Sequence, residues 1–154
     1  MAKSFTGWDY MICGADDVYP KYVKPLNEMA KLYDGKLIWV RDELFDVQMT
    51  FPVVTKGWYD NNKQIFDERF EHNFCDTDLQ TRASQKGEVI KCFNVSFDHR
   101  HPLKTNEPLD ELYKTSQSTY AADEKRYYDK YKTARQSPKT FACQIRDWLA
   151  RWLD

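Results

Sequence analysis

Several features that would assign this chain to a common class are missing from it. No apolar run is long enough to cross a bilayer, so we expect no transmembrane segment. No block of Lys or Arg stands out and the formal net charge is −1, which argues against a nucleic-acid-binding surface. The first residues lack the apolar segment of a signal peptide. These absences predict a cytoplasmic protein that binds no nucleic acid.

Closely spaced cysteines are also missing. The chain has four cysteines, and none belongs to a Cys-x-x-Cys pair: Cys13, Cys75, Cys92 and Cys143. This spacing argues against a zinc knuckle or a redox motif. Cys13 and Cys92 lie in apolar runs and fit buried small hydrophobes, so a reducing compartment suits the chain better than a disulfide framework does.

What is present fits one globular α/β unit. A length of 154 residues allows a single core, and 42% apolar with 31% charged residues is the balance of a folded protein. Short apolar runs alternate with amphipathic segments, the pattern of an α/β fold. The periodicity predicts strands at 9–13, 37–40 and 88–97, helices at 22–33, 76–86 and 109–134, and a last amphipathic helix after Ser137.

Acidic and imidazole side chains follow strands or begin helices at three points. Asp16 and Asp17 follow the first predicted strand, Asp76 begins a helix, and His99 and His101 follow a later strand. Ligands of open α/β sheets bind beyond the carboxyl ends of strands. If the three segments converge, their carboxylates and imidazole suit a divalent cation, with one carboxylate left to act as a base.

The order of these segments resembles the GT-A fold of family 2 glycosyltransferases. The run Gly14-Ala15-Asp16-Asp17-Val18-Tyr19-Pro20 is similar to the family's acidic metal motif. Residues 74–83 with Gly87 resemble its Glu-Asp-x-Asp-Leu-x-x-Arg helix start, and His99-Arg100-His101-Pro102 is similar to its downstream metal-site histidine. Residues 52–60 and 66–70 resemble the acceptor-side segment between them, so that the resemblance covers about Phe5 to Pro102.

The resemblance implies a partial GT-A-like domain at 1–108, with a short mixed sheet and flanking helices, and a helical tail at 109–154. The tail would pack on the same domain or on a partner. The implied activity is inverting transfer of a sugar, dependent on a nucleotide-sugar and a metal, to the hydroxyl of a glycan or another acceptor. The implied cofactor is Mn²⁺ or Mg²⁺.

Site roles follow from the same resemblance. Asp76 matches the catalytic base, while Asp16 and Asp17 match the group that binds the nucleotide-sugar diphosphate. The metal would be held by Asp16 and His99, with His101 as a substitute for the histidine. Two further residues are assigned to the acceptor side, namely Trp58 and Asp78.

The chain departs from the family pattern in two motifs and in extent. Gly14 stands at the first acidic position of the metal motif, and Cys75 stands where the family has an acidic residue before the base. The resemblance also leaves out most of the nucleotide-binding half. We therefore expect a chain that is truncated or inactive alone, or one completed by a separate nucleotide-binding chain or by a second copy.

Simpler interpretations of the same residues stay open. Asp16 and Asp17 suit a turn, and Asp76 suits a helix N-cap. His99 and His101, two residues apart on a strand, would point to opposite faces, so at most one should reach a site. The whole chain could also be a non-catalytic binding or assembly module, or a hydrolase that activates water at a histidine-bound metal, which the sequence supports less well.

Overall fold

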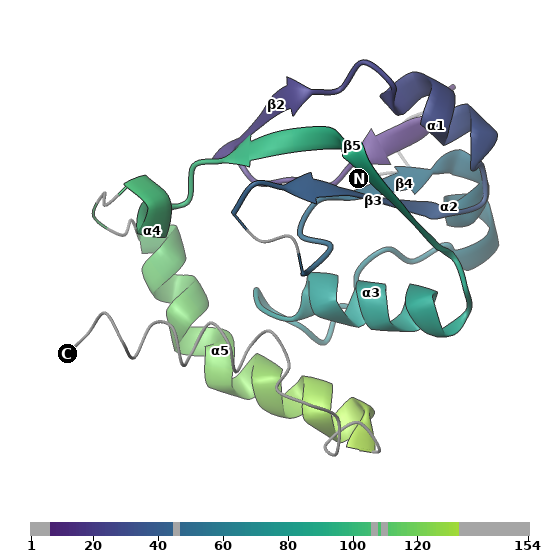
Figure 1. The fold of residues 1–154 in the computed structure, drawn as a ribbon. Helices are drawn as coiled ribbons and strands as arrows, with labels where there is room; N and C mark the ends of the chain where they lie inside the picture. Colours follow the sequence, from purple (N-terminus) through teal and green to yellow (C-terminus); the bar gives the residue numbers. More distant parts are fainter. Residues whose placement is uncertain (1–6, 45–46, 106–107, 109–110, 133–154) are drawn as a thin grey trace.

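The computed structural model describes residues 7–44, 47–105, 108 and 111–132, and builds them around one mixed sheet. Five strands form this sheet (Figure 1), in the order β1 (Tyr10–Ile12), β4 (Pro52–Thr55), β3 (Leu37–Asp42), β5 (Val89–His99) and β2 (Val18–Tyr22). The prediction of a mixed α/β fold is confirmed.

The direction of the strands brings several chain segments to one edge of the sheet. β3 and β5 are parallel, so that both strands end at the same edge. β2 runs antiparallel to β5, and its first residue, Val18, pairs with His99 at the end of β5. The turn before β2 therefore lies beside the last residue of β5.

Helices cover both faces of the sheet (Figure 1), with α1 (Leu26–Leu32) on one face and α2 (Lys56–Asn62) and α3 (Cys75–Gln85) on the other. Side chains of β3 alternate between the two layers, as the strand pleat requires. The core beneath α1 contains Leu26, Ala30, Ile38, Val40, Phe51, Val53, Cys92, Val95 and Phe97. The core beneath α2 and α3 contains Leu37, Trp39, Met49, Val54, Trp58, Leu79 and Ala83.

The chain leaves the sheet after β5 and continues through α4 (Pro102–Thr105) into α5 (Glu111–Lys130), which extends past the start of α3 (Figure 1). Tyr127 of α5 packs with Phe70 and Phe74 in a third apolar cluster. Within the same helix, the buried carboxylate of Asp123 accepts hydrogen bonds from the backbone N–H groups of residues 71–73. These contacts attach α5 to the loop that leads into α3.

Local patterns located some elements well and others poorly. The helix predicted at 76–86 and the strand predicted at 88–97 match α3 and β5 within two residues, and the helix predicted at 109–134 contains α5. The helix predicted from Tyr22 begins only at Leu26, because residues 18–22 form the edge strand β2 and Pro25 is the N-cap. β4 and α2 were not predicted. The last amphipathic helix, after Ser137, lies outside the described residues.

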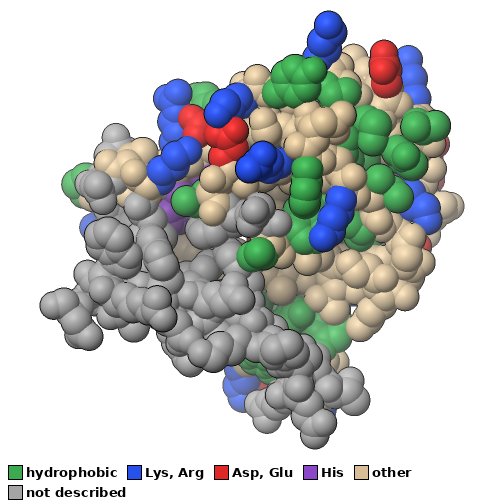
Figure 2. Space-filling model, viewed as in Figure 1, with side chains coloured by type: hydrophobic (Ala, Val, Ile, Leu, Met, Phe, Trp, Pro, Cys, Tyr) green, Lys and Arg blue, Asp and Glu red, His purple; other side chains and the backbone are tan. Residues whose placement is uncertain are grey.

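The surface is mixed in character. Hydrophobic side chains stand in several separate groups among charged and polar ones on the face shown in Figure 2. Across the described ranges, every helix is too short or too polar to cross a bilayer.

Candidate functional site

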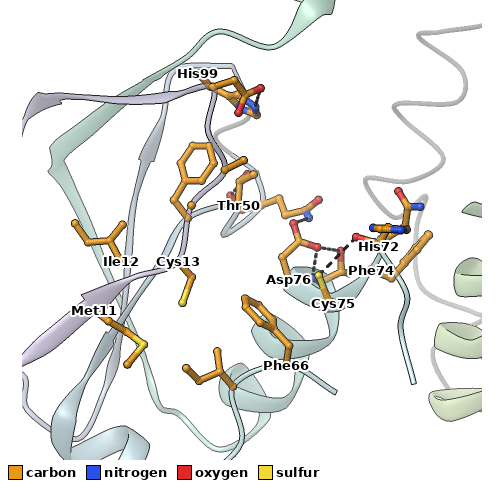
Figure 3. Close-up of a pocket in the computed structure, with 18 of the residues that line it drawn as sticks. Met11, Ile12, Cys13, Thr50, Phe66, His72, Phe74, Cys75, Asp76 and His99 are labelled. Atoms are coloured by element: carbon orange, nitrogen blue, oxygen red, sulfur yellow. Dashed lines mark hydrogen bonds and ion pairs between the residues drawn. The ribbon is translucent and has the colours of Figure 1, made fainter. Parts of the chain in front are cut away.

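A cleft of about 960 Å³ lies between β1 and the start of α3. Figure 3 shows the three consecutive residues Met11, Ile12 and Cys13 on one side of it, and Asp76 with Phe66 on the other. Its lining also includes the polar side chains of Asp17, Gln48, Thr50, Lys63, Gln64, Glu68, His72, Asn73, Thr77, His99 and His101. Asp17, Asp76 and His99, the members of the three predicted segments, thus reach one cleft.

The ends of β3 and β5 carry a row of polar side chains that reaches the cleft at Asp17 and His99. Nδ1 of His99 lies 3.1 Å from Oδ2 of Asp42, and Nε2 lies 3.4 Å from Oδ2 of Asp17. Asp42 is 1% exposed and His99 is 5% exposed, so this row of carboxylate, imidazole and carboxylate is largely shielded from water. An ionised carboxylate only accepts hydrogen bonds, so a proton on Nδ1 of His99 is donated to Asp42 and a proton on Nε2 is donated to Asp17.

Asp17 has one satisfied and one unsatisfied oxygen. Its Oδ2 accepts a hydrogen bond of 2.5 Å from the hydroxyl of Tyr113, at the beginning of α5. Its Oδ1 is buried and has no hydrogen-bond partner among the described residues. Buried polar atoms nearly always have a partner, so a water molecule or a ligand is expected at this oxygen.

Both histidines of the His-Arg-His segment line the cleft, against our expectation that at most one would. The alternation rule does not apply here because β5 ends at His99 and His101 lies beyond the strand. The two rings meet edge to face with centroids 5.4 Å apart, and the ring of His101 contacts that of Tyr113 at 4.8 Å. Burial lowers the pKa of His101, and neighbouring His99 adds to this shift, so His101 favours its neutral form.

Asp76 lies in the first turn of α3 and faces the cleft from the side opposite β1 (Figure 3). Burial raises the pKa of its carboxyl, against the hydrogen bonds it receives from the backbone and hydroxyl of Thr77 and from the amide of Gln48. A carboxylate with a raised pKa is a stronger base than an exposed one.

Asp76 is not the N-cap of α3, although its side-chain type suits that position. The N-cap is Phe74, which adopts a left-handed conformation with φ of 63° and accepts the N–H of Asp78 on its carbonyl at 2.8 Å. The rings of Tyr120 and Tyr127 pack against Phe74 with centroids 5.3 and 5.5 Å away. Contacts from α5 therefore fix the point at which α3 begins, and with it the position of Asp76.

The other residues that we predicted for the site lie elsewhere. Asp16 is exposed on the turn after β1, and its neighbour Asp17 lines the cleft instead. Trp58 is buried in the core, with Nε1 donating to Glu88 at 2.8 Å. Asp78 is fully buried beside α5 and binds Arg82, Lys130 and Tyr131.

The cysteines that face the cleft are poor nucleophiles at neutral pH. Burial raises the pKa of Cys13 to about 11. Burial and the adjacent carboxylate of Asp76 raise the pKa of Cys75 to about 12. A thiol attacks as its thiolate, which is scarce at such pKa values. Cysteine-based covalent catalysis is therefore disfavoured at this cleft.

Two protein atoms at this cleft could ligate a metal ion. Oδ1 of Asp17 is buried without a hydrogen-bond partner among the described residues, and Nε2 of His99, 3.4 Å from Oδ2 of Asp17, can ligate a cation in place of carrying a proton. Across the described ranges, no three Cys, His, Asp or Glu side chains gather in an arrangement that could hold a metal by themselves. One carboxylate and one imidazole suit an ion that keeps open positions for phosphate oxygens and water.

The sequence analysis missed the polar residues that contact Asp17, Asp76 and His99 from other segments, namely Asp42, Gln48 and Tyr113. Asp42 had a usable signal, because it is a carboxylate two residues after the strand predicted at 37–40. Gln48 lies in an irregular segment, and Tyr113 is one of ten tyrosines in the chain. Neither position carries a local pattern that would single it out.

Comparison of the chain with protein-family models, with curated proteins and with solved structures gives no match. The function must therefore be argued from the cleft itself.

Proposed function

We propose that this cleft is the catalytic and acceptor side of a metal-dependent glycosyltransferase with a GT-A-like sheet. The supporting observation is that Asp17, Asp76 and His99 line one cleft although they come from three distant parts of the chain. The sequence resemblance assigns these same segments to metal, base and metal in that order. A volume of about 960 Å³ is also within the range of clefts that bind small-molecule ligands.

Asp76 is the base in this proposal. An acceptor hydroxyl gives its proton to the Asp76 carboxylate while its oxygen forms a bond to the anomeric carbon of the donor sugar. The bond from that carbon to the diphosphate oxygen breaks, and the diphosphate leaves with the electron pair. In an inverting reaction the displacement is in line and forms no covalent enzyme intermediate. The raised pKa of Asp76 makes its carboxylate a stronger base than an exposed one.

Asp17 and His99 hold the cation in this proposal, with the remaining positions left to diphosphate oxygens. A divalent cation bound there offsets the negative charge that develops on the leaving group. When Nε2 of a neutral His99 ligates the cation, the ring proton lies on Nδ1 and is donated to Asp42. Asp17 therefore takes the role of metal ligand, which the sequence analysis assigned to Asp16.

The experiment is calorimetric titration of the chain with uridine diphosphate and guanosine diphosphate, each with and without Mn²⁺. We expect binding heat with at least one of them only when Mn²⁺ is present. Negligible heat under both conditions would remove the nucleotide-sugar proposal.

The turn after β1 offers a matched pair of control variants. Asp17→Asn should abolish the Mn²⁺-dependent heat, whereas Asp16→Asn, at the exposed neighbouring position, should leave it intact. Asp76→Asn should bind as the parent chain does and lose sugar transfer with any donor that the parent chain uses. Unchanged turnover in Asp76→Asn would exclude Asp76 as the base.

A further inference from the structure

The hydroxyl of Tyr113 reaches the cleft from a part of the chain that our proposed site does not otherwise use. It donates to Oδ2 of Asp17 at 2.5 Å across 96 positions of sequence. The Tyr113 ring contacts His101 edge to face, and His101 contacts His99 in the same way. The Tyr113 ring therefore packs against the histidine segment while its hydroxyl donates to Asp17.

We infer that Tyr113 is a positioning residue, which holds the Asp17 carboxylate in the orientation that binds a divalent cation. The inference rests on the proposed function, because it concerns the same cation. With Oδ2 fixed by Tyr113, Oδ1 is the oxygen left buried without a hydrogen-bond partner in the described part of the chain. A carboxylate that ligates a metal usually has its orientation set by such an outer hydrogen bond.

This role makes α5 part of the cation site. The same helix that carries Tyr113 is attached to the loop before α3 through Asp123, and to α3 itself through Lys130 and its partner Asp78. Docking of α5 and binding of the cation then share one hydrogen bond, so that each strengthens the other by the same factor. Asp76, at the start of α3, belongs to the same packed unit.

The test is titration with Mn²⁺ alone, without nucleotide, of the full chain and of Tyr113→Phe. The variant keeps the ring and loses only the hydroxyl, so we expect its affinity for Mn²⁺ to fall about 10- to 100-fold. Tyr59→Phe is the matched control, since Tyr59 also lines the cleft and its hydroxyl has no bond to Asp17. The control should bind Mn²⁺ as the parent chain does.

A second measurement separates positioning from general loosening of the fold. The electron paramagnetic resonance spectrum of Mn²⁺ at saturation reports the arrangement of its ligands. A changed spectrum in Tyr113→Phe, with an unchanged one in Tyr59→Phe, supports the inference. Equal affinity and equal spectra in both variants would overturn it while the proposed function stands.

Two further outcomes also decide the question. Tighter binding by Tyr113→Phe would mean that the hydroxyl competes with the cation, and would overturn the positioning role. Absence of Mn²⁺ binding by the parent chain would overturn the inference together with the metal dependence of the proposed function.

Discussion

His99 is oriented by Asp42, whose Oδ2 lies 3.1 Å from Nδ1 of the imidazole. The contact exists because β3 and β5 are parallel and end at the same edge of the sheet, one strand supplying each residue. The other oxygen of Asp42 accepts the backbone N–H of Leu44 at 2.8 Å, so the carboxylate cannot turn away without losing a second bond. When Nε2 ligates a cation, the one proton of the neutral imidazole therefore lies on Nδ1, where Asp42 accepts it.

Replacing Asp42 by Asn should weaken cation binding while preserving the side-chain volume. If the Asn oxygen keeps the bond to Leu44, its NH₂ group faces Nδ1 of His99 and shifts the ring proton to Nε2. A protonated Nε2 cannot ligate a metal, so we expect the affinity for Mn²⁺ to fall about 10- to 100-fold by calorimetry. Asp98→Asn, at an ion-paired position outside the cleft lining, is the control and should bind normally. Normal binding by Asp42→Asn would refute this account of His99.

Asp123→Ala should destabilise the fold strongly. The carboxylate is fully buried and accepts from three successive backbone N–H groups, at 71–73, and from Arg126. Although burial alone would raise the pKa of Asp123, the N–H donors and Arg126 hold it below its usual range. Each N–H left without a partner costs about 1–3 kcal/mol, so we expect a loss of about 3 kcal/mol or more in urea unfolding.

The pH dependence of this variant has a defined sign. A lowered pKa means that the folded chain favours the ionised carboxylate, so the stabilisation by Asp123 is present above the usual carboxyl range and lost as the pH falls through the lowered pKa. The difference in free energy of unfolding between the parent chain and Asp123→Ala should therefore become smaller in acid. Glu124→Ala, at the next position, should unfold close to the parent chain. A small difference in free energy of unfolding at neutral pH would show that the loop before α3 keeps its structure without Asp123.

Asp76→Asn should stabilise the fold at neutral pH. Burial raises the pKa of Asp76, so its ionisation destabilises the folded chain. This penalty is absent below the usual carboxyl range, about pH 4, and it grows as the pH rises through the raised pKa. The thermal midpoint of Asp76→Asn should match that of the parent chain in acid and exceed it toward neutral pH.

The surface carboxylate of Asp60 has a pKa shifted in the direction opposite to that of Asp76. Hydrogen bonds from Lys56 and Lys63 lower the pKa of Asp60. Asp60→Asn should therefore be neutral or slightly destabilising toward neutral pH. If Asp76→Asn were less stable than the parent chain at neutral pH, the Asp76 carboxylate would be a structural hydrogen-bond acceptor. The increase in stability that is expected on removing a buried catalytic carboxylate would then be absent.

Local signals in the sequence were sufficient for some elements. Alternating Phe93, Val95 and Phe97 predicted β5, and Gly87, which adopts a φ of 66°, correctly marked the end of α3. The four-residue strand β4 is too short to show a period and is buried on both faces. Its identity comes from pairing with β1 and β3, which no local pattern reports.

Site residues could be predicted only where an acidic or imidazole side chain stands at the end of a strand or the start of a helix. Asp17, Asp76 and His99 were found because each follows a strand or begins a helix. The preference for Asp16 over Asp17 failed to match the cleft, since which of two adjacent side chains turns inward depends on the register of β2 against β5. Tyr113 depends on the docking of α5, which is a tertiary contact.

Gly57 provides a test of a local contact at the start of α2. Its N–H donates to Oδ1 of Asp34 at 2.7 Å, and a Cβ at this position would lie 2.8 Å from both Asp34 oxygens. A Gly-to-Ala change in an exposed helix normally stabilises by about 0.5–1 kcal/mol. Here the Asp34 carboxylate must swing away and give up its bond to the helix start, which costs about 0.5–2 kcal/mol.

We therefore expect Gly57→Ala to be neutral or to destabilise by about 1 kcal/mol in the parent chain. In an Asp34→Ala background the clash and the bond are both gone, and the same change should stabilise. The double-mutant cycle, measured by urea unfolding, should give a coupling of about 1 kcal/mol. A stabilising Gly57→Ala with no coupling would mean that Asp34 does not cap α2, and that Thr55, whose hydroxyl accepts the N–H of Trp58, is sufficient to begin the helix.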